Sequence, residues 1–200
     1  MPTVTALRAA GRGRVGVELD GSPWRAFPVE AAASAGLYVG CELDRERVRR
    51  LARARRRAVA VATAAASLRR RALTERELEE RLERRGVRRS DRQDAVKVLG
   101  DAGYLDDARF AAARAESLAE RGSGDALIRH DLETRGVEAE TVEAALAALA
   151  PEAERARELV RRRGAGAATA RRLASRGFAP DAVEEALAEH VARNGDDVVG

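Results

Sequence analysis

The spacing of hydrophobic and polar positions changes near residue 43. Upstream, apolar residues occupy every second position over 15–19, and Asp20-Gly21 follows as a hairpin turn signal. A second apolar run lies at 4–7, and two aromatic residues lie within 24–27. We therefore expect two or three short β-strands. Because a lone hairpin is marginal in water, this piece should pack on the short segment after it or on the first helix.

From residue 43 onward the apolar positions have helical spacing, and one motif repeats. The form L-x-x-R-G-apolar occurs as LERRGV (82–87), LETRGV (132–137) and LASRGF (173–178). Glycine is expected at C′, the left-handed position just past a helix, with leucine at C3 and the last apolar residue at C″, as in a Schellman turn. The motif thus predicts three abrupt helix stops. The residues that define them are Leu82 and Gly86, Leu132 and Gly136, and Leu173, Gly177 and Phe178.

This pattern predicts a mainly α fold: three tandem three-helix repeats in an elongated curved array, preceded by a small β extension. The predicted helices span 58–71, 75–85 and 91–102, then 107–120, 125–135 and 139–149, then 152–163, 167–176 and 180–192. The predicted domains are the β extension 1–42, a basic linking helix 43–57, repeats at 58–103, 104–150 and 151–193, and a polar tail 194–200.

The stretch GDAGYLDDARFA (100–111) contains two adjacent carboxylates, Asp106 and Asp107. Neighbouring residues on a helix point in different directions, so these acids are poorly placed to share a proton or a metal ion. As a helix start, Asp106 is a favoured N-cap and Asp107 meets the positive end of the helix dipole. Leu105 and Phe110 have the spacing of a hydrophobic staple. We expect helix capping here, not catalysis.

Charge is distributed unevenly along the chain. The formal net charge is +4, but residues 45–73 hold eleven arginines and one acid, whereas residues 74–160 hold 21 acids and 15 bases. A local basic block on a nearly balanced chain suggests an anionic partner. It also fits a solvated helix face that the neighbouring acidic repeats neutralise. The residues alone do not decide between these interpretations.

The chain offers little for catalysis or for a metal. It has no phosphate-binding P-loop, serine-hydrolase or zinc-protease motif. His130 and His190 are expected on the surface of different repeats, and Cys41 has no cysteine partner. The uncharged run 58–68 is too short to cross a membrane and should be a buried helix. We expect a cytoplasmic, monomeric, non-enzymatic protein with no cofactor, metal, small-molecule substrate or membrane contact.

The order of these motifs resembles the RecX family of recombination regulators. GYLDDARFA, from Gly103 through Tyr104 to Ala111, lies ahead of L-x-x-R-G-V and a later R-G-F. LRRRALTERELEERL at 68–82 is similar to the family's first repeat, and GVELDG with GLYVGCELD is similar to an N-terminal extension of some members. The resemblance implies a protein that binds RecA and the RecA–single-stranded-DNA filament and lowers ATPase and strand-exchange activity, thereby regulating DNA repair and recombination.

The resemblance supplies no catalytic set, so the candidate contact residues come from the basic block. They are Arg49, Arg50, Arg53, Arg56, Arg57, Arg69, Arg70 and Arg71. An alternative is a helical-repeat protein that binds DNA directly through the 45–73 arginines. The chain lacks the clustered aromatic residues typical of a single-strand stacking platform, which counts against that alternative.

Overall fold

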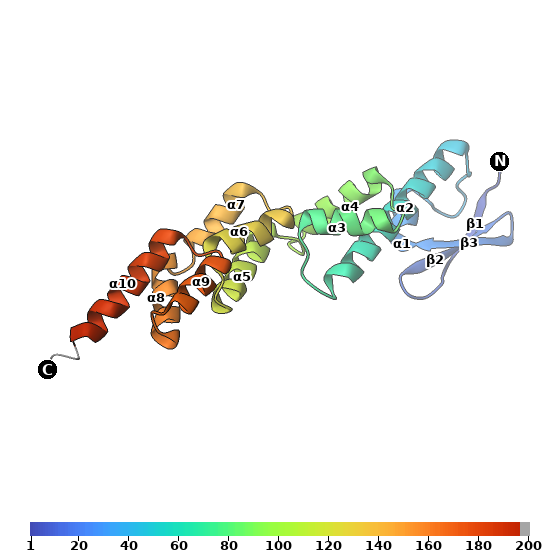
Figure 1. The fold of residues 1–200 in the computed structure, drawn as a ribbon. Coiled ribbons are helices and arrows are strands. Elements are labelled where there is room, and N and C mark those ends of the chain that lie inside the picture. Colours follow the sequence, from blue (N-terminus) through green and yellow to red (C-terminus); the bar gives the residue numbers. More distant parts are fainter. Residues whose placement is uncertain (197–200) are drawn as a thin grey trace. The chain divides into compact units, whose positions relative to one another are not determined.

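The computed structural model describes residues 1–196, with side chains through Arg193. Within this range the chain forms a three-stranded sheet followed by ten helices (Figure 1). The elements are β1 (Val4–Ala9), β2 (Arg14–Leu19), β3 (Ser22–Pro28), α1 (Val29–Ser34), α2 (Arg45–Leu68), α3 (Glu75–Arg84), α4 (Arg89–Asp101), α5 (Asp107–Glu120), α6 (Asp125–Thr134), α7 (Ala139–Ala147), α8 (Glu152–Arg163), α9 (Ala167–Ser175) and α10 (Pro180–Asp196).

Contacts divide the chain into two compact units. The first comprises Met1–Arg71 and Leu78–Leu105, and the second comprises Ala72–Glu77 and the chain from Asp106 onward. The short segment Ala72–Glu77, which includes the first turn of α3, therefore belongs with the later helices.

The sheet of the first unit is an antiparallel meander in the order β1-β2-β3. Asp20 and Gly21 join β2 to β3 with φ values of 49° and 80°. Two successive positive φ angles are typical of the two-residue hairpin turn whose twist matches that of the strands. The Asp20 carboxylate also accepts a hydrogen bond from the Thr3 amide at 2.9 Å. The predicted strands and turn are confirmed.

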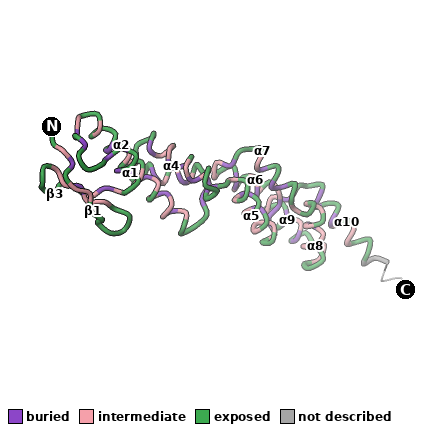
Figure 2. Tube along the Cα trace, turned by 180° about the vertical axis from the view of Figure 1, so that it is seen from behind, coloured by how far each residue is buried: buried purple, intermediate pink, exposed green. Residues whose placement is uncertain are grey.

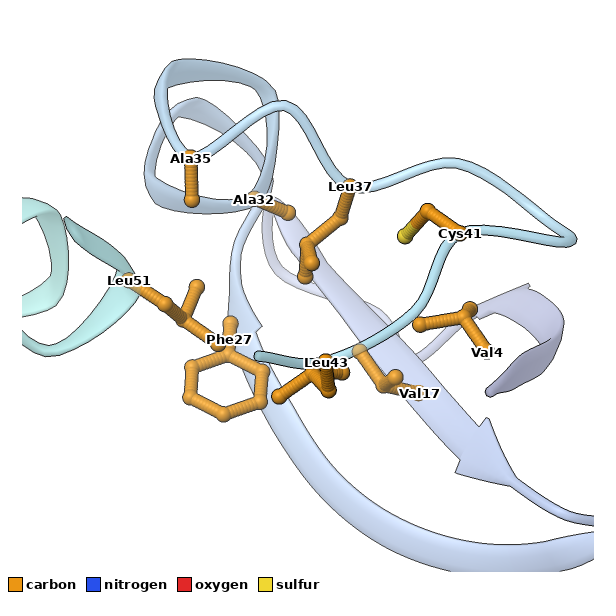
Figure 3. Close-up of a cluster of buried hydrophobic side chains, with 9 residues drawn as sticks. All are labelled: Val4, Val17, Phe27, Ala32, Ala35, Leu37, Cys41, Leu43 and Leu51. Atoms are coloured by element: carbon orange, nitrogen blue, oxygen red, sulfur yellow. The ribbon is translucent and has the colours of Figure 1, made fainter. Parts of the chain in front are cut away.

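The sheet buries its inner face against α1 and the start of α2. Apolar side chains from all three strands, from α1 and from the following loop meet there, and Leu51 of α2 closes the cluster (Figure 3). The sheet therefore packs both on the segment after it and on the first long helix, as its marginal size requires. The buried members are Val4, Val17, Phe27, Ala32, Ala35, Leu37, Cys41, Leu43 and Leu51.

Helix α2 is one continuous helix of 24 residues. The linking helix expected at 43–57 and the repeat helix expected at 58–71 are therefore not separated by any break in the backbone, and the helix ends at Leu68. Alanine and arginine both favour helix, and nothing near residue 58 would interrupt the chain. Asp44 begins the helix by accepting a hydrogen bond from the Arg47 amide.

All three predicted helix stops are Schellman turns. Gly86, Gly136 and Gly177 have φ values of 72°, 83° and 82°. In each turn the C″ amide donates to the carbonyl oxygen of the motif leucine, with N···O distances of 3.1, 3.1 and 3.2 Å. The leucines are at most 2% exposed, so each stop is anchored in its own helical core.

The later helices form two further three-helix cores. Helices α5, α6 and α7 enclose one, and α8, α9 and α10 enclose the other. Figure 2 shows buried and exposed positions alternating along these helices, as amphipathic helices require. The buried members are Ala111, Ala115, Ile128, Leu132, Val137, Val142, Ala145 and Leu146 in the first core and Ala156, Val160, Leu173, Phe178, Val183 and Ala186 in the second.

The predicted helices differ from the observed ones mainly at their ends. Helices α5 and α8 have the predicted bounds, whereas α4 begins two residues earlier, at Arg89, and α10 continues to Asp196. The first three residues of the tail expected at 194–200 are therefore helical, and 197–200 lie outside the described residues. No helix within the described part of the chain is long and apolar enough to span a membrane.

Candidate interaction surface on the arginine-rich helix

Five of the candidate arginines lie on one side of α2. At 3.6 residues per turn they fall within about 120° around the helix axis. We call this set the α2 arginine face: Arg49, Arg50, Arg53, Arg56 and Arg57. In the second half of α2 the same side carries Ala60, Ala64 and Ser67, which are at most 3% exposed. The arginine face is thus the continuation of the side that packs in the core of the first repeat.

Two members of the α2 arginine face are tied to α4. Arg56 lies 3.4 Å from the carboxylate of Asp91, whose side chain is only 7% exposed, and Arg57 lies 3.8 Å from the carboxylate of Asp94. A buried carboxylate needs a cation beside it, so Arg56 has a structural role in addition to any binding role. Arg57 makes a longer and more exposed pair, which contributes little to stability.

The guanidinium groups of the other three members are more available to a binding partner. Arg50 pairs with Glu46 at 3.3 Å, but both side chains are at least half exposed, so the pair holds Arg50 only weakly. Arg49 and Arg53 are exposed and have no ion pair or side-chain hydrogen bond with any residue whose side chain the structure describes. Their guanidinium groups are the least engaged of the face.

A groove runs along this face between α1 and α2. It has a volume of about 640 Å³, and Arg50, Arg53 and Arg57 line it together with Glu30 and Ser34 of α1. Its remaining lining is apolar and comes from α1, α2 and α4: Ala31, Ala54, Ala58, Val61, Ala62 and Val98. A basic rim over an apolar floor suits a protein segment that presents carboxylates beside small apolar side chains.

The remaining candidates lie elsewhere. Arg69, Arg70 and Arg71 are exposed and follow the C-terminal end of α2. Arg57 and Arg69 are twelve residues apart, which is about 18 Å along a helix. The eight candidates therefore form one group of five and one group of three. The sequence indicated the arginines but not the α1 side of the groove, because only tertiary packing places Glu30 and Ser34 beside α2.

The two acids of LDD have different partners. Asp106 is the N-cap of α5 and accepts a hydrogen bond from the Arg109 amide at 2.8 Å, as predicted. Asp107 begins the same helix, but its carboxylate accepts from the amide of Glu75 at 2.9 Å and so caps α3. Burial raises the pKa of Asp107 above its ordinary value. The prediction for Asp107 considered only the dipole of its own helix and did not include this hydrogen bond to α3.

The structure gives the other titratable candidates no shared site. Cys41 is a free thiol, 1% exposed, in the core beneath the sheet. His130 lies on α6 and His190 on α10, in different repeats. Among the described residues, no group of three or more histidine, cysteine or acidic side chains is arranged to hold a metal ion.

A known family model matches the second three-helix repeat of this chain. Residues 106–146 match the family model described as RecX, second three-helix domain. The Regulatory protein RecX of Xanthomonas axonopodis pv. citri (strain 306) is 43% identical over 95 residues, which cover 47% of this chain and 59% of that protein. The chain therefore spans somewhat more than half the length of such relatives.

A broader match comes from Stenotrophomonas maltophilia (strain R551-3). Its Regulatory protein RecX is 37% identical over 127 residues, which cover 58% of this chain and 78% of that protein. A crystal structure of regulatory protein RecX superposes with a TM-score of 0.81 at 23% identity, over 92% of this chain and 98% of the other. RecX from Lactobacillus salivarius gives a TM-score of 0.59 at 18% identity, over 67% of this chain and 96% of that one.

The structural matches establish the fold, and the sequence matches extend the relationship over most of a curated relative. The stretch 106–146 that matches the family model contains Asp106, the N-cap of α5, and the L-x-x-R-G stop of α6, both of which have a defined role in the structure. This chain belongs to the RecX family of regulatory proteins.

Proposed function

We propose that this protein binds RecA and the RecA–single-stranded-DNA filament and lowers the filament's ATPase and strand-exchange activity. Its role would be the regulation of DNA repair, homologous recombination and the SOS response in the cytoplasm. The observation that carries the proposal is membership in a family whose curated members are named regulatory proteins. The link to RecA rests on the resemblance of its ordered motifs to that family.

We further propose that the α2 arginine face and Arg69–Arg71 form part of the contact surface. Arg49 and Arg53 are exposed and lack a described ionic partner, so binding a carboxylate or phosphate would not first require breaking an ion pair. The groove beside them adds an apolar floor that a basic patch alone would lack. On this proposal the protein acts as a monomer, by occupying a surface of its partner and without catalysis.

The direct test is DNA-dependent ATP hydrolysis by RecA on single-stranded DNA. Substoichiometric amounts of this protein should slow hydrolysis and strand exchange. Binding to the assembled filament should be measured in parallel by co-sedimentation. The proposal is abandoned if the protein neither binds the filament nor changes either activity.

The contact surface is tested with a matched pair of double variants. Arg49→Gln with Arg53→Gln should raise the concentration needed for half-inhibition roughly tenfold, which corresponds to about 1.4 kcal/mol. Arg84→Gln with Arg85→Gln removes the same charge from exposed positions outside the α2 arginine face and should change inhibition little. Equal losses in both variants would mean that net charge, not this surface, determines binding.

A second candidate is direct DNA binding through the same arginines. The exposed guanidinium groups of α2 favour it, since arginine contacts phosphates readily. For duplex DNA the affinity would fall with salt at about 0.9 log units per phosphate contact per log unit of salt. Affinity for free DNA as strong as that for the filament would favour this candidate. Filament binding that persists when free DNA competes would favour the RecA proposal.

A further inference from the structure

A second basic surface lies in the second unit, far along the chain from α2. The C-terminal end of α5, the last turn of α8 and helix α9 enclose a groove of about 370 Å³. We call it the basic groove. Half of its ten lining residues are arginines, and one is acidic: Arg121, Arg162, Arg163, Arg172, Arg176 and Glu120.

Two of these arginines are engaged within the protein. Arg176 donates to the backbone carbonyl oxygens of Arg121 and Gly122, which fixes its guanidinium group against the end of α5. Arg162 donates to Glu158 at 2.6 Å, and Glu158 is shared with Arg161.

The other three arginines have no such partner. The guanidinium groups of Arg121, Arg163 and Arg172 make no ion pair or hydrogen bond with any residue whose side chain the structure describes. All three are exposed, so their donors are open to a ligand. They come from three different helix ends, and the tertiary structure brings them to one groove.

Neutralisation of helix dipoles does not account for this charge. The C-terminal ends of α5, α8 and α9 meet at the groove, and each carries about half a negative charge. Together they offset about one and a half of the formal charge of +4 from the lining side chains. With Glu158 also counted, an excess of roughly one to two positive charges is left for an external anion.

The arginine-rich composition of the chain does not account for the excess positive charge of the basic groove either. A neighbouring groove of about 630 Å³ lies between α8 and α10. Each of its three lining arginines pairs with an acid: Arg157 with Glu185 and Glu189, Arg193 with Glu189, and Arg161 with Glu158. The basic groove is the one of these two in which cations meet without matching acids.

The lining also limits the class of ligand. Leu159 and Leu173 line the groove beside the arginines, and it contains no aromatic side chain on which a base could stack. Guanidinium groups present paired donors that match phosphate oxygens. We propose that the basic groove binds the phosphate groups of a polyanion, independently of base sequence. Its proposed function is separate from the contact made by α2.

The test measures binding without any recombinase, so its outcome does not depend on the proposed RecA activity. Fluorescence anisotropy would follow a labelled oligo(dT) strand over a salt series, and sodium tripolyphosphate would be tested as a compact phosphate ligand by calorimetry and by competition. The groove variant combines Arg121→Gln, Arg163→Gln and Arg172→Gln. The control combines Arg84→Gln, Arg85→Gln and Arg89→Gln, which are exposed in the first unit.

For oligo(dT), the groove variant should reduce the slope of log affinity against log salt by roughly two, since each single-strand phosphate contact contributes about 0.7. The control should leave the slope nearly unchanged. If only tripolyphosphate binds, and the groove variant removes that binding, the ligand is a compact polyphosphate and the proposal stands. Equal losses in both variants, or no binding of either anion to the unmodified protein, would overturn it.

Circular dichroism and the thermal unfolding midpoint would establish that both variants fold. If the triple groove variant does not fold, Arg163→Gln alone serves as the test. Arg163 is exposed in the last turn of α8, and its replacement should lower the slope by about 0.7 for the strand. An unchanged slope in this folded variant would likewise overturn the proposal.

Discussion

Asp106 and Asp107 are adjacent, yet they stabilise two different helices. Asp106 caps its own helix, α5, whereas Asp107 reaches the first amide of α3. An exposed amide at a helix start needs an acceptor, and a carboxylate is a strong one. The pair therefore satisfies backbone donors at two helix starts, which explains two adjacent acids without any chemistry between them.

Replacing Asp106 with alanine should lower the free energy of unfolding by about 0.5–2 kcal/mol, since the N-cap acceptor for Arg109 is lost. Urea denaturation at neutral pH would measure the change. Asp101→Ala is a suitable control because it removes only an exposed pair with Lys97, and it should change stability by less than about 0.5 kcal/mol. Unchanged stability together with a lost activity would contradict the capping role of Asp106.

Asp131 has a strongly lowered pKa with a clear cause. Arg114 binds both of its carboxylate oxygens, at 2.7 and 2.9 Å, and Arg135 donates to it at 2.9 Å. Hydrogen bonds from Arg114, with a further contribution from Arg135, lower the pKa of Asp131 to about 2. Arg135 is also bonded to Glu77 at 2.6 Å, so one arginine of the repeated motif joins α6 to the start of α3.

This lowered pKa predicts a loss of stability in acid. The folded pKa lies below the unfolded one, so the contribution is present above about pH 4 and is lost as the pH falls toward 2. After allowance for partial exposure, the contribution is about 1–2 kcal/mol. Urea unfolding at a series of pH values should show a shallower acid dependence in Asp131→Asn than in the unmodified protein. Identical slopes in the two proteins would exclude a contribution from this carboxylate.

At the scale of elements, the repeated glycine has one conformation but different surroundings. A side-chain carbon at Gly86 would meet nothing within 4 Å, whereas at Gly177 it would lie 2.6 Å from the Leu127 backbone nitrogen. The helix stop explains glycine at both positions through its positive φ. Of these two glycines, only Gly177 has close packing against backbone as a second requirement; at the third copy, Gly136, the added carbon would meet the Arg76 side chain.

Gly86→Ala should therefore cost only the left-handed strain, about 1–2 kcal/mol, and Gly177→Ala should cost clearly more. The reason is that the added methyl group at Gly177 would force backbone atoms of α6 to move. Urea denaturation of the two variants provides the comparison, with each serving as the other's control. Equal losses would show that the close approach at Gly177 is relieved without cost.

The starts of α3 and α6 are held by the same kind of contact inside the second unit. The Thr74 hydroxyl donates a hydrogen bond to the carbonyl oxygen of Arg135 at 2.7 Å. Arg135 directly precedes Gly136, the glycine that ends α6. One repeat later, the amide of Gly124 donates to the carbonyl oxygen of Arg176 at 2.8 Å. The repeated motif thus ends a helix and also offers a carbonyl acceptor to the start of an earlier helix.

An acid completes each of these contacts. Asp107 at the start of α5 accepts from the Glu75 amide at 2.9 Å, and Glu152 at the start of α8 accepts from the Asp125 amide at 2.6 Å. The first turns of α3 and α6 therefore each receive one cap from outside their own segment, and in α3 this cap adds to the local one, in which the Thr74 hydroxyl accepts from the Glu77 amide at 3.1 Å. A search for caps within each helix start would miss them, because the acceptors lie 32 and 27 residues away in sequence.

At the scale of the whole molecule, the two contact units do not follow the boundaries of the sequence repeats. Ala72–Glu77 belongs with the second unit although it precedes most of α3 in the first. In repeat proteins stability is the sum of local units and their nearest-neighbour contacts, so a core substitution acts mainly on its own unit.

Leu132→Ala should destabilise the core of α5–α7 by about 2–5 kcal/mol, since this leucine is fully buried. Native-state hydrogen exchange should then accelerate for amides of α5, α6 and α7 and change less for β2 and the start of α2. Leu51→Ala, in the core beneath the sheet, should show the reverse pattern. Equal acceleration throughout the chain in both variants would indicate a single cooperative unit.

The amino-acid pattern alone is sufficient to predict most of the local structure. Alternation predicted the strands, Asp20-Gly21 their turn, and the glycine motif the three helix stops, because turn and cap geometry depends on residues only a few positions apart. It also indicated the family through the order of its motifs. It did not show that α2 is continuous across residue 58, where one helix replaces the expected linking helix at 43–57 and repeat helix at 58–71.

Features that join residues far apart in the sequence depend on tertiary packing. It placed α1 beside the α2 arginine face, separated Arg69–Arg71 from that face, and directed Asp107 to α3. It also brought Arg121, Arg163 and Arg172 from three helix ends to the basic groove. A periodic pattern specifies which side of a helix is buried, but the identity of the neighbour depends on how the helices pack, and that packing creates the candidate binding surfaces.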